Sequence, residues 1–140
     1  DFSHDPNILP VIADNMKKYD AVIGSRYVQG GGIKNWGIFR KIVSKLGSLY
    51  AKIILGVNIN DFTGGFNCYR KKVLETINLD NITSQGYSFQ IELKYKAFKK
   101  GFNIKEIPII FVDRRVGFSK MNSMIVLEAF FKVWKFRFEV

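Results

Sequence analysis

Cysteine is almost absent from this 140-residue chain, which carries only Cys68. A single cysteine excludes an internal disulfide and a zinc site built on cysteines, and it favours a reducing compartment. Long uncharged apolar runs are absent too, because no stretch reaches the roughly 18 residues of a membrane-spanning helix. Acidic residues are few: 12 Asp and Glu stand against 22 Lys and Arg, for a formal net charge of +10. We therefore expect an anionic partner, such as a nucleic acid, an anionic lipid or a phosphorylated small molecule.

The chain does contain enough apolar material for a core. Hydrophobic residues make up 47% of it, which argues against disorder, and the length fits one domain. Thirteen Phe and two Trp beside the positive charge favour a partner with an apolar part. The chain opens on Asp1, with neither an initiator Met nor a signal peptide. We therefore expect a piece of a longer protein.

Helical and strand patterns alternate along the chain. Apolar residues at helical spacing, with start and stop signals, predict helices over residues 6–16, 38–55, 70–77, 87–100 and 121–138. Short β-branched and aromatic runs predict strands over residues 21–24, 66–69 and 104–112. Pro108 suggests an edge or a bulge in the last strand, and the glycines of 29–32 predict a flexible loop. Interleaved strands and helices indicate an α/β fold.

The predicted helix 38–55 has two different faces. Large apolar residues recur along it at helical spacing, whereas Arg40 and Ser44, four residues apart, share another face. That second face continues through small residues as far as Ala51. Small residues there permit the close approach of another element or of a ligand.

A basic loop, residues 113–120, follows the apolar run of the last strand. It holds two arginines, a glycine, a serine and a lysine. The planar fork of Arg and the point charge of Lys both suit phosphate oxygens, and the glycine permits a turn that gathers the donors. The alternative is a solvated basic turn.

Six short motifs follow one another along the chain. They are Asp1-Phe-Ser-His4, Gly24-Ser-Arg26, Arg40 with Ser44, Asp61-Phe-Thr-Gly-Gly-Phe66, Gly86-Tyr-Ser-Phe-Gln-Ile-Glu92 and Asp113-Arg-Arg-Val-Gly-Phe-Ser-Lys-Met121. In this order they resemble the carboxy-terminal part of polyprenol-phosphate mannosyltransferases, the dolichol-phosphate mannose synthases of glycosyltransferase family 2. The resemblance covers essentially all 140 residues. It implies a glycosyltransferase type-A fold, Rossmann-like, with residues 1–140 as an acceptor-side fragment that lacks the amino-terminal nucleotide-binding half.

The resemblance also implies a metal site. Asp1 matches the second Asp of an Asp-x-Asp motif that holds Mg²⁺ or Mn²⁺ on the donor diphosphate. Hard divalent ions prefer carboxylate oxygens and are shared with substrate phosphates, which suits this assignment. Ser3 stands where the family often has a glutamine as a further ligand. The alternative for Asp1 is an ordinary acid near a chain end.

Two anion sites are implied as well. Arg26, Arg40 and Ser44 match the positions that receive the phosphate of the acceptor lipid. Arg114 and Lys120 match the loop that closes over the donor diphosphate. Ordinary surface arginines are the alternative reading of Arg26 and Arg40.

Asp61 resembles the acid that the family places near the acceptor, and it is the candidate catalytic residue. A lipid phosphate is already ionised near neutral pH and needs little help from a base. The task is mainly to hold two anions in line while cations absorb the developing charge. We therefore expect Asp61 to position rather than deprotonate, and an Asp that caps a turn is the close alternative.

The activity implied by the resemblance is inverting transfer of mannose from GDP-mannose to polyprenyl or dolichyl phosphate at the cytoplasmic face of a membrane. One alternative is glucosyl transfer to the same lipid. Another is a basic, non-catalytic module that binds membranes or nucleic acid. The acidic residues Asp1 and Asp61 are unfavourable on a surface that binds a row of phosphate groups. We therefore expect an enzyme and no nucleic-acid partner.

The last predicted helix, 121–138, is expected to lie on the membrane surface without crossing it. Its many large apolar residues favour contact with lipid, whereas four charged residues interrupt it and exclude a spanning helix: Glu128, Lys132, Lys135 and Arg137. The alternative is that its aromatic residues pack against the rest of the enzyme or against a second protomer.

Overall fold

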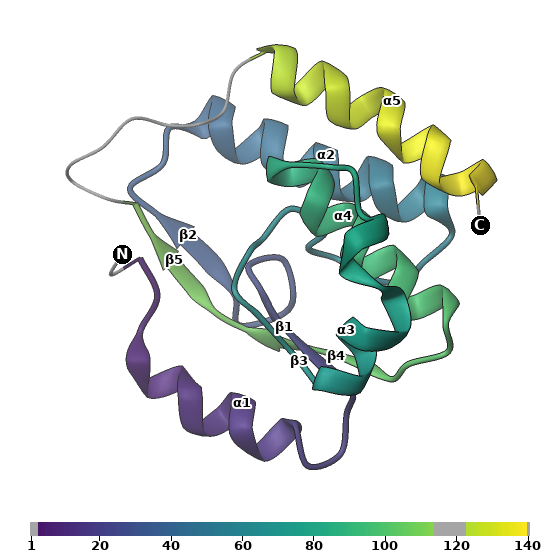
Figure 1. The fold of residues 1–140 in the computed structure, drawn as a ribbon. Helices are drawn as coiled ribbons and strands as arrows, with labels where there is room; N and C mark the ends of the chain where they lie inside the picture. The colour runs from purple at the N-terminus through teal and green to yellow at the C-terminus, as the bar shows by residue number, and fades with distance from the viewer. Residues whose placement is uncertain (1–2, 114–122, 140) are drawn as a thin grey trace.

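A three-stranded β-sheet forms the centre of the fold in a computed structural model, which describes residues 3–113 and 123–139 (Figure 1). Its strands, in the order β3-β1-β4, are β1 (Ala21–Ser25), β3 (Asn67–Tyr69) and β4 (Ile104–Pro108). β1 runs antiparallel to β3 and parallel to β4, with Ile23 opposite Glu106. Every residue of β1 is buried, as expected for a central strand that is covered on both faces.

Helices cover both faces of this sheet. On one face Val22 packs in a core with Ile107 and with Ile12 of α1 (Leu9–Asn15), which follows the 3₁₀ turn η1 (Pro6–Ile8). On the other face Ile23 joins a larger core. Its helices are α2 (Ile38–Leu55), α4 (Gly86–Lys99) and α5 (Ser123–Glu139). The remaining elements, α3 (Lys71–Ile77) and the 3₁₀ turn η2 (Leu79–Asn81), follow β3, and α3 packs against α4.

A second, two-stranded sheet corrects the prediction for residues 104–112, which do not form one continuous strand. The segment divides at Ile109 into β4 and β5 (Ile110–Val112). β5 pairs in parallel with β2 (Gly32–Lys34), which begins at the last residue of the predicted loop 29–32. Pro108 has no N–H to continue a ladder. The Ile109 N–H still donates to the Ser25 carbonyl at 3.0 Å, but the Ile109 carbonyl accepts from the Gly32 N–H at 3.0 Å. The chain therefore changes partner from β1 to β2 at this point.

The predicted helices are confirmed, with boundaries that differ by a few residues at most. α2 spans the predicted residues 38–55 and ends at Gly56 in the left-handed region, with φ +68°. Asp5 caps the first turn, because its carboxylate accepts from the Asn7 N–H at 2.9 Å. Together with the strands, these helices agree with the predicted α/β class.

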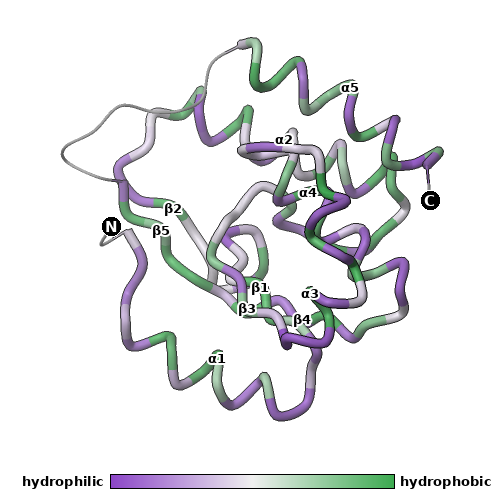
Figure 2. Tube along the Cα trace, viewed as in Figure 1, coloured by the Kyte–Doolittle hydropathy of each residue, from purple (hydrophilic) through white to green (hydrophobic). Residues whose placement is uncertain are grey.

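α2 turns its small-residue face inward and its large apolar residues outward. Ser44, Ser48 and Ala51 are buried, and the Phe62 N–H donates to the Ser48 hydroxyl at 3.1 Å. The predicted close approach of another element is thus confirmed. The exposed large side chains of α2 are Ile38, Phe39, Ile42, Leu46, Leu49 and Ile53. An apolar face of this kind ordinarily packs on a core, yet here its large side chains are exposed. The helix itself lies beside α5 (Figure 2).

Candidate functional site

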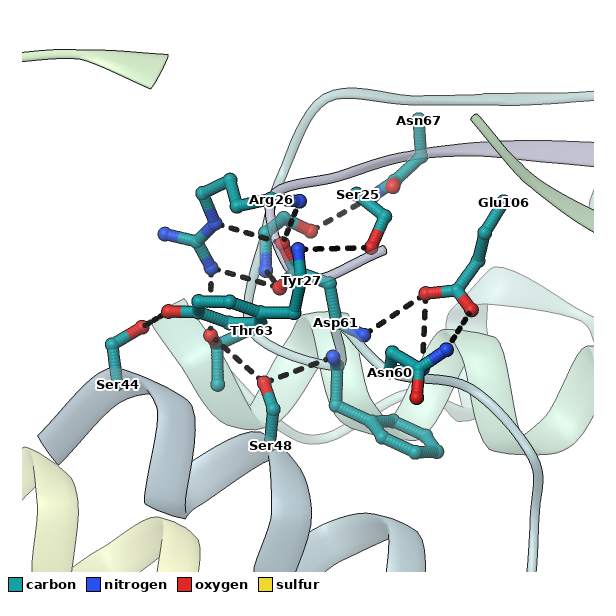
Figure 3. A network of polar contacts seen from close by, with 12 residues as sticks. Ser25, Arg26, Tyr27, Ser44, Ser48, Asn60, Asp61, Thr63, Asn67 and Glu106 are labelled. Atoms are coloured by element: carbon teal, nitrogen blue, oxygen red, sulfur yellow. Dashed lines mark hydrogen bonds and ion pairs between the residues drawn. The ribbon is translucent and has the colours of Figure 1, made fainter. Parts of the chain in front are cut away.

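The site is centred on a buried ion pair between Arg26, directly after β1, and Asp61, in the loop after α2 (Figure 3). Arg26 Nε donates to Asp61 Oδ2 and Nη2 donates to Oδ1, both at 2.8 Å. The Arg26 backbone N–H adds a third bond to Oδ2 at 3.0 Å. Arg26 is 8% exposed and Asp61 is fully buried. Arg26 is therefore not the ordinary surface arginine that the sequence left open.

Both partners of this pair are charged near neutral pH. Burial alone would raise the pKa of Asp61, but the hydrogen bonds and charge of Arg26, with a contribution from Lys94, bring that pKa below its usual value. Burial likewise opposes the charge of Arg26, and Asp61 more than compensates, so the Arg26 pKa is raised. A carboxylate with a lowered pKa is a weak base, which favours a positioning role for Asp61.

The turn around Asp61 is fixed from several sides. Glu106 on β4 accepts from the backbone N–H groups of Asn60 and Asp61, at 2.9 and 3.0 Å. Asp61 Oδ1 also accepts from the Gly64 N–H at 3.0 Å, so Asp61 caps the turn and pairs with Arg26 at once. A Cβ on Gly64 would lie 3.1 Å from Asp61 Oδ2, which explains the glycine at this position.

Ser44 joins the same network through Tyr27, whose ring centroid lies 5.1 Å from the Arg26 guanidinium, and Thr63 extends the network on the other side. The hydroxyls of Tyr27 and Ser44 share a hydrogen bond. Arg26 Nη2 also donates to Thr63 Oγ1 at 3.0 Å. Tyr27 follows Arg26 directly, and Thr63 lies inside the 61–66 motif. Their position in or next to these motifs could have indicated from the sequence that they belong to the site. Two of the predicted acceptor-phosphate residues, Arg26 and Ser44, therefore belong to one polar network with Asp61.

Arg40, the third of these residues, approaches this network through an indole ring. Its guanidinium lies 3.9 Å from the ring centroid of Trp36, and the Arg26 guanidinium lies 5.6 Å from the same ring. Arg40 Nη1 also donates to Asp113 Oδ2 at 3.2 Å. Trp36 thus links the two predicted cations, and nothing in the sequence had indicated it.

Two hydrogen-bond donors in this cluster are unsatisfied. Arg40 Nε and Trp36 Nε1 are buried and have no hydrogen-bond partner among the residues that the structure describes. Buried donors in folded proteins are nearly always paired, and orphaned ones call for an explanation such as an ion. Next to two guanidinium groups, the group best suited to accept from them is an anion.

The remaining predicted residues lie at, or outside, the limits of the described chain. Asp1, Arg114 and Lys120 are outside the described residues. Ser3 is buried, and its carbonyl accepts from the Val112 N–H at 3.0 Å, at the end of β5.

A metal site does not emerge from residues 3–113 and 123–139 alone. They contain no group of three His, Cys, Asp or Glu residues that could hold an ion. Ser3 could supply at most a neutral oxygen, so the predicted metal depends on Asp1.

An apolar pocket of about 340 Å³ adjoins the polar network, between α2, α4 and α5. Its polar lining comes from Ser44, Thr63 and Tyr87. The rest of its lining is mostly apolar: Val43, Leu46, Gly47, Tyr50, Ile91, Val126, Ala129, Phe130 and Val133. Because Ser44 and Thr63 belong to both, the arrangement can hold a molecule with an anionic head and an apolar body.

The helices that form this pocket also bear on the membrane prediction. Across the described parts of the chain, no helix combines the length and the apolar character needed to traverse a bilayer. α5 is anchored to the core by Val133 and Phe136, while most of its other large apolar residues are exposed.

Two curated relatives match nearly the whole chain, whereas no protein-family model matches it. The polyprenol monophosphomannose synthase of Mycolicibacterium smegmatis is 44% identical over 134 residues, which are 95% of this chain and 51% of the relative. The undecaprenyl-phosphate mannosyltransferase of Micrococcus luteus is 46% identical over 129 residues, 92% of this chain and 53% of the relative. The chain thus spans about half the length of these relatives. By sequence it is a homologue of these two polyprenyl-phosphate mannosyltransferases over about half of their length.

Proposed function

We propose that the complete protein transfers mannose from GDP-mannose to a polyprenyl or dolichyl phosphate, with inversion, and that residues 1–140 form the acceptor side of a glycosyltransferase type-A fold. The observation that carries this proposal is the pair of guanidinium groups, Arg26 and Arg40, gathered at the Trp36 ring beside an apolar pocket. A prenyl phosphate matches both parts of this site, because its phosphate suits the arginines and its hydrocarbon chain suits the pocket. The names of the two relatives support the same acceptor and the same sugar.

The acceptor phosphate is held by groups that the fold leaves available. Arg26 uses Nε and Nη2 on Asp61 and Thr63, and within residues 3–113 and 123–139 Nη1 makes no hydrogen bond, which suits it to an acceptor oxygen. Arg40 Nε and Trp36 Nε1 are buried donors that find no acceptor in the described part of the chain. Charge-assisted bonds of this kind are stronger than neutral ones and fix the attacking oxygen without a base. Asp61 contributes by orienting Arg26.

The donor diphosphate is assigned to Arg114 and Lys120, with Mg²⁺ or Mn²⁺ held by Asp1 and Ser3. The support is connectivity. The Ser3 carbonyl accepts from the Val112 N–H at 3.0 Å, so the segment that contains Ser3 pairs with the end of β5, the strand that precedes the basic loop in sequence.

The test is mannosyl transfer to polyprenyl phosphate by the complete protein, with Gly47→Leu as the diagnostic variant. A Cβ on Gly47 meets nothing within 4 Å, and Gly47 lines the pocket, so a leucine there favours the helix while it fills space meant for the prenyl chain. We expect kcat/KM for polyprenyl phosphate to fall roughly tenfold or more, the cost of overfilling an apolar site, with affinity for GDP unchanged.

Lys45→Leu is the matched control, because it adds the same side chain to the exposed side of α2. Removal of divalent metal with EDTA should abolish transfer, and added Mg²⁺ should restore it. Lipid-linked product from UDP-glucose but not from GDP-mannose would replace the mannosyl assignment with the glucosyl one. Absence of lipid-linked sugar from either donor would contradict the proposal.

We further propose that α5 and the outward face of α2 rest on the membrane, at its cytoplasmic face. On α5 the exposed large apolar residues are Met124, Val126, Leu127, Phe130, Phe131, Trp134 and Phe138. Lysine and arginine on such a helix can reach lipid head groups while aromatic rings settle at the acyl boundary. The pocket lies between these two helices and α4, so membrane contact would bring it to a lipid that stays in the bilayer.

The complete protein should float with liposomes that contain anionic lipid, and Phe131→Glu/Trp134→Glu should reduce the floating fraction. The two side chains are 63% and 42% exposed, so the change should leave the fold intact. A matched control is Leu79→Glu/Phe98→Glu, which adds the same charges at exposed apolar positions of η2 and α4, outside α2 and α5. If wild type does not float, or floats no better than the folded Phe131→Glu/Trp134→Glu variant, the aromatic face of α5 packs on protein instead.

A further inference from the structure

A fully buried lysine lies beneath the turn that carries Asp61. Lys94 of α4 has no exposed surface. Its Nζ donates to three backbone carbonyls of one turn: that of Asp61 at 2.9 Å, that of Phe62 at 3.1 Å and that of Gly64 at 2.7 Å. An ammonium group has three N–H donors, and all three are used here.

A buried ammonium is costly, so its position calls for an explanation. Lysine is almost never fully buried unless it is paired. Lys94 stands three residues after Ile91 and next to Tyr95, on the face of α4 that packs in the core, where an apolar residue would be the ordinary choice. Neither the family motifs nor the assignments of Arg26, Arg40 and Asp61 give this lysine a task.

We propose that Lys94 is a positioning residue of the acceptor-phosphate site: its ammonium holds the Asp61–Gly64 turn in the shape that presents the Asp61 carboxylate and the Thr63 hydroxyl to Arg26. This inference rests on the proposed function only in that the anion bound next to Arg26 is taken to be the acceptor phosphate. The turn itself is a property of the fold.

The contacts form an unbroken chain from Lys94 to the site. The Lys94 ammonium fixes the carbonyls on both sides of Thr63. Thr63 Oγ1 and the Asp61 carboxylate then fix Nη2 and Nε of Arg26. A turn that relaxes would let the Arg26 guanidinium rotate, and Nη1 would lose its orientation. Lys94 thus acts through Arg26 and need not touch the substrate.

The same geometry makes the site sensitive to pH. The charged groups that act on Lys94 come from three other segments: Asp61 and Glu106 favour its charge, and Arg26 opposes it. Burial is the largest influence and lowers the pKa of Lys94 to about 7. A neutral amine has only two N–H donors, so above that pH one carbonyl loses its partner and the turn loses a positive charge.

This effect can be told apart from the titration of the ligand, because the two have opposite signs. A phosphomonoester gains its second charge near pH 6, and a more highly charged phosphate binds two arginines more tightly. If Lys94 holds the turn, affinity should instead fall as pH rises. His4 does not interfere above pH 6.5, because burial and Arg26 lower its pKa and keep it neutral.

The experiment measures the affinity of the complete protein for a short-chain prenyl phosphate between about pH 6.5 and 8.5, by titration calorimetry. For wild type we expect affinity to fall with rising pH, by at most about tenfold per pH unit, the limit for one proton. Lys94→Met should bind several-fold more weakly at pH 6.5 and should lose the falling trend. Lys99→Met, the same change at an exposed position of α4, should behave as wild type.

Hydrogen exchange of residues 61–66 supplies a readout that needs no ligand. The turn should exchange faster in Lys94→Met than in Lys99→Met at the same pH. Faster exchange with unchanged affinity and an unchanged pH trend would make Lys94 merely structural and overturn the inference. A wild-type affinity that does not change, or that rises with pH, would also overturn it.

If Lys94→Met fails to fold, the pH dependence of the wild-type affinity decides alone. If wild type binds no prenyl phosphate at any pH, the proposed function fails, while exchange still shows whether Lys94 holds the turn.

Discussion

Replacing Asp61 by asparagine should lower the free energy of unfolding by about 3–5 kcal/mol, the range for removing one partner of a buried ion pair. Arg26 is 8% exposed, so its charge would be left without a counterion away from water. The new amide would also turn an N–H₂ group toward donors of Arg26 or Gly64, which bond to the two carboxylate oxygens now. Urea denaturation of the complete protein and of the variant measures the difference.

The control for this change is Asp14→Asn, which breaks an exposed pair with Lys17 at 3.1 Å. Exposed pairs contribute about 0–1 kcal/mol, so the two variants should differ by several kcal/mol. The sign of the pH dependence follows from the lowered pKa of Asp61. Its stabilising contribution is present above the unfolded-state pKa of about 4 and is lost as the pH falls through the lower folded-state value. The difference in free energy of unfolding between wild type and Asp61→Asn should therefore become smaller at acid pH. A difference that is small at neutral pH, or that does not change with pH, would contradict the ion-pair account.

Arg40→Ala should weaken binding of prenyl phosphate by tenfold or more and leave affinity for GDP-mannose nearly unchanged. A charge-assisted hydrogen bond is worth about 1.5–3 kcal/mol, which is the source of that factor. The change removes the unsatisfied Nε and the guanidinium stacked on Trp36. Arg40→Lys should recover only part of the affinity, because a lysine keeps the charge without the planar fork.

Lys45→Ala is the matched control for Arg40→Ala, since it removes a cation from the exposed side of the same helix. Lys120→Ala, at the position that matches the donor loop, should show the reverse selectivity. Titration of each variant with prenyl phosphate and with GDP-mannose separates these effects. If Arg40→Ala and Lys45→Ala cause the same small losses with both ligands, Arg40 does not bind the acceptor phosphate and its contacts with Trp36 and Asp113 serve the fold alone.

Local features of the sequence were enough to predict the helices and the mixture of strands and helices. The span of α2 and its end at Gly56 follow from apolar spacing and from the left-handed conformation that glycine permits, with φ +68°. The order of six motifs was enough to indicate the family that the two relatives support. These signals are read over a few neighbouring residues, so they need no knowledge of which segments meet.

Pairings between distant segments were decided only by the tertiary structure. Residues 104–112 divide between two sheets because β1 and β2 offer separate edges to β4 and β5, which no pattern within the segment records. Arg26 and Asp61 are 35 residues apart, and their roles looked separate until the fold joined them. The chain also places an ammonium, Lys94, in the core and apolar residues of α2 outside. Both placements reverse the usual preference, and neither could be predicted from local sequence. The three carbonyls that receive the Lys94 ammonium come from a turn about 30 residues earlier. Only the packing shows which face of α2 is left uncovered.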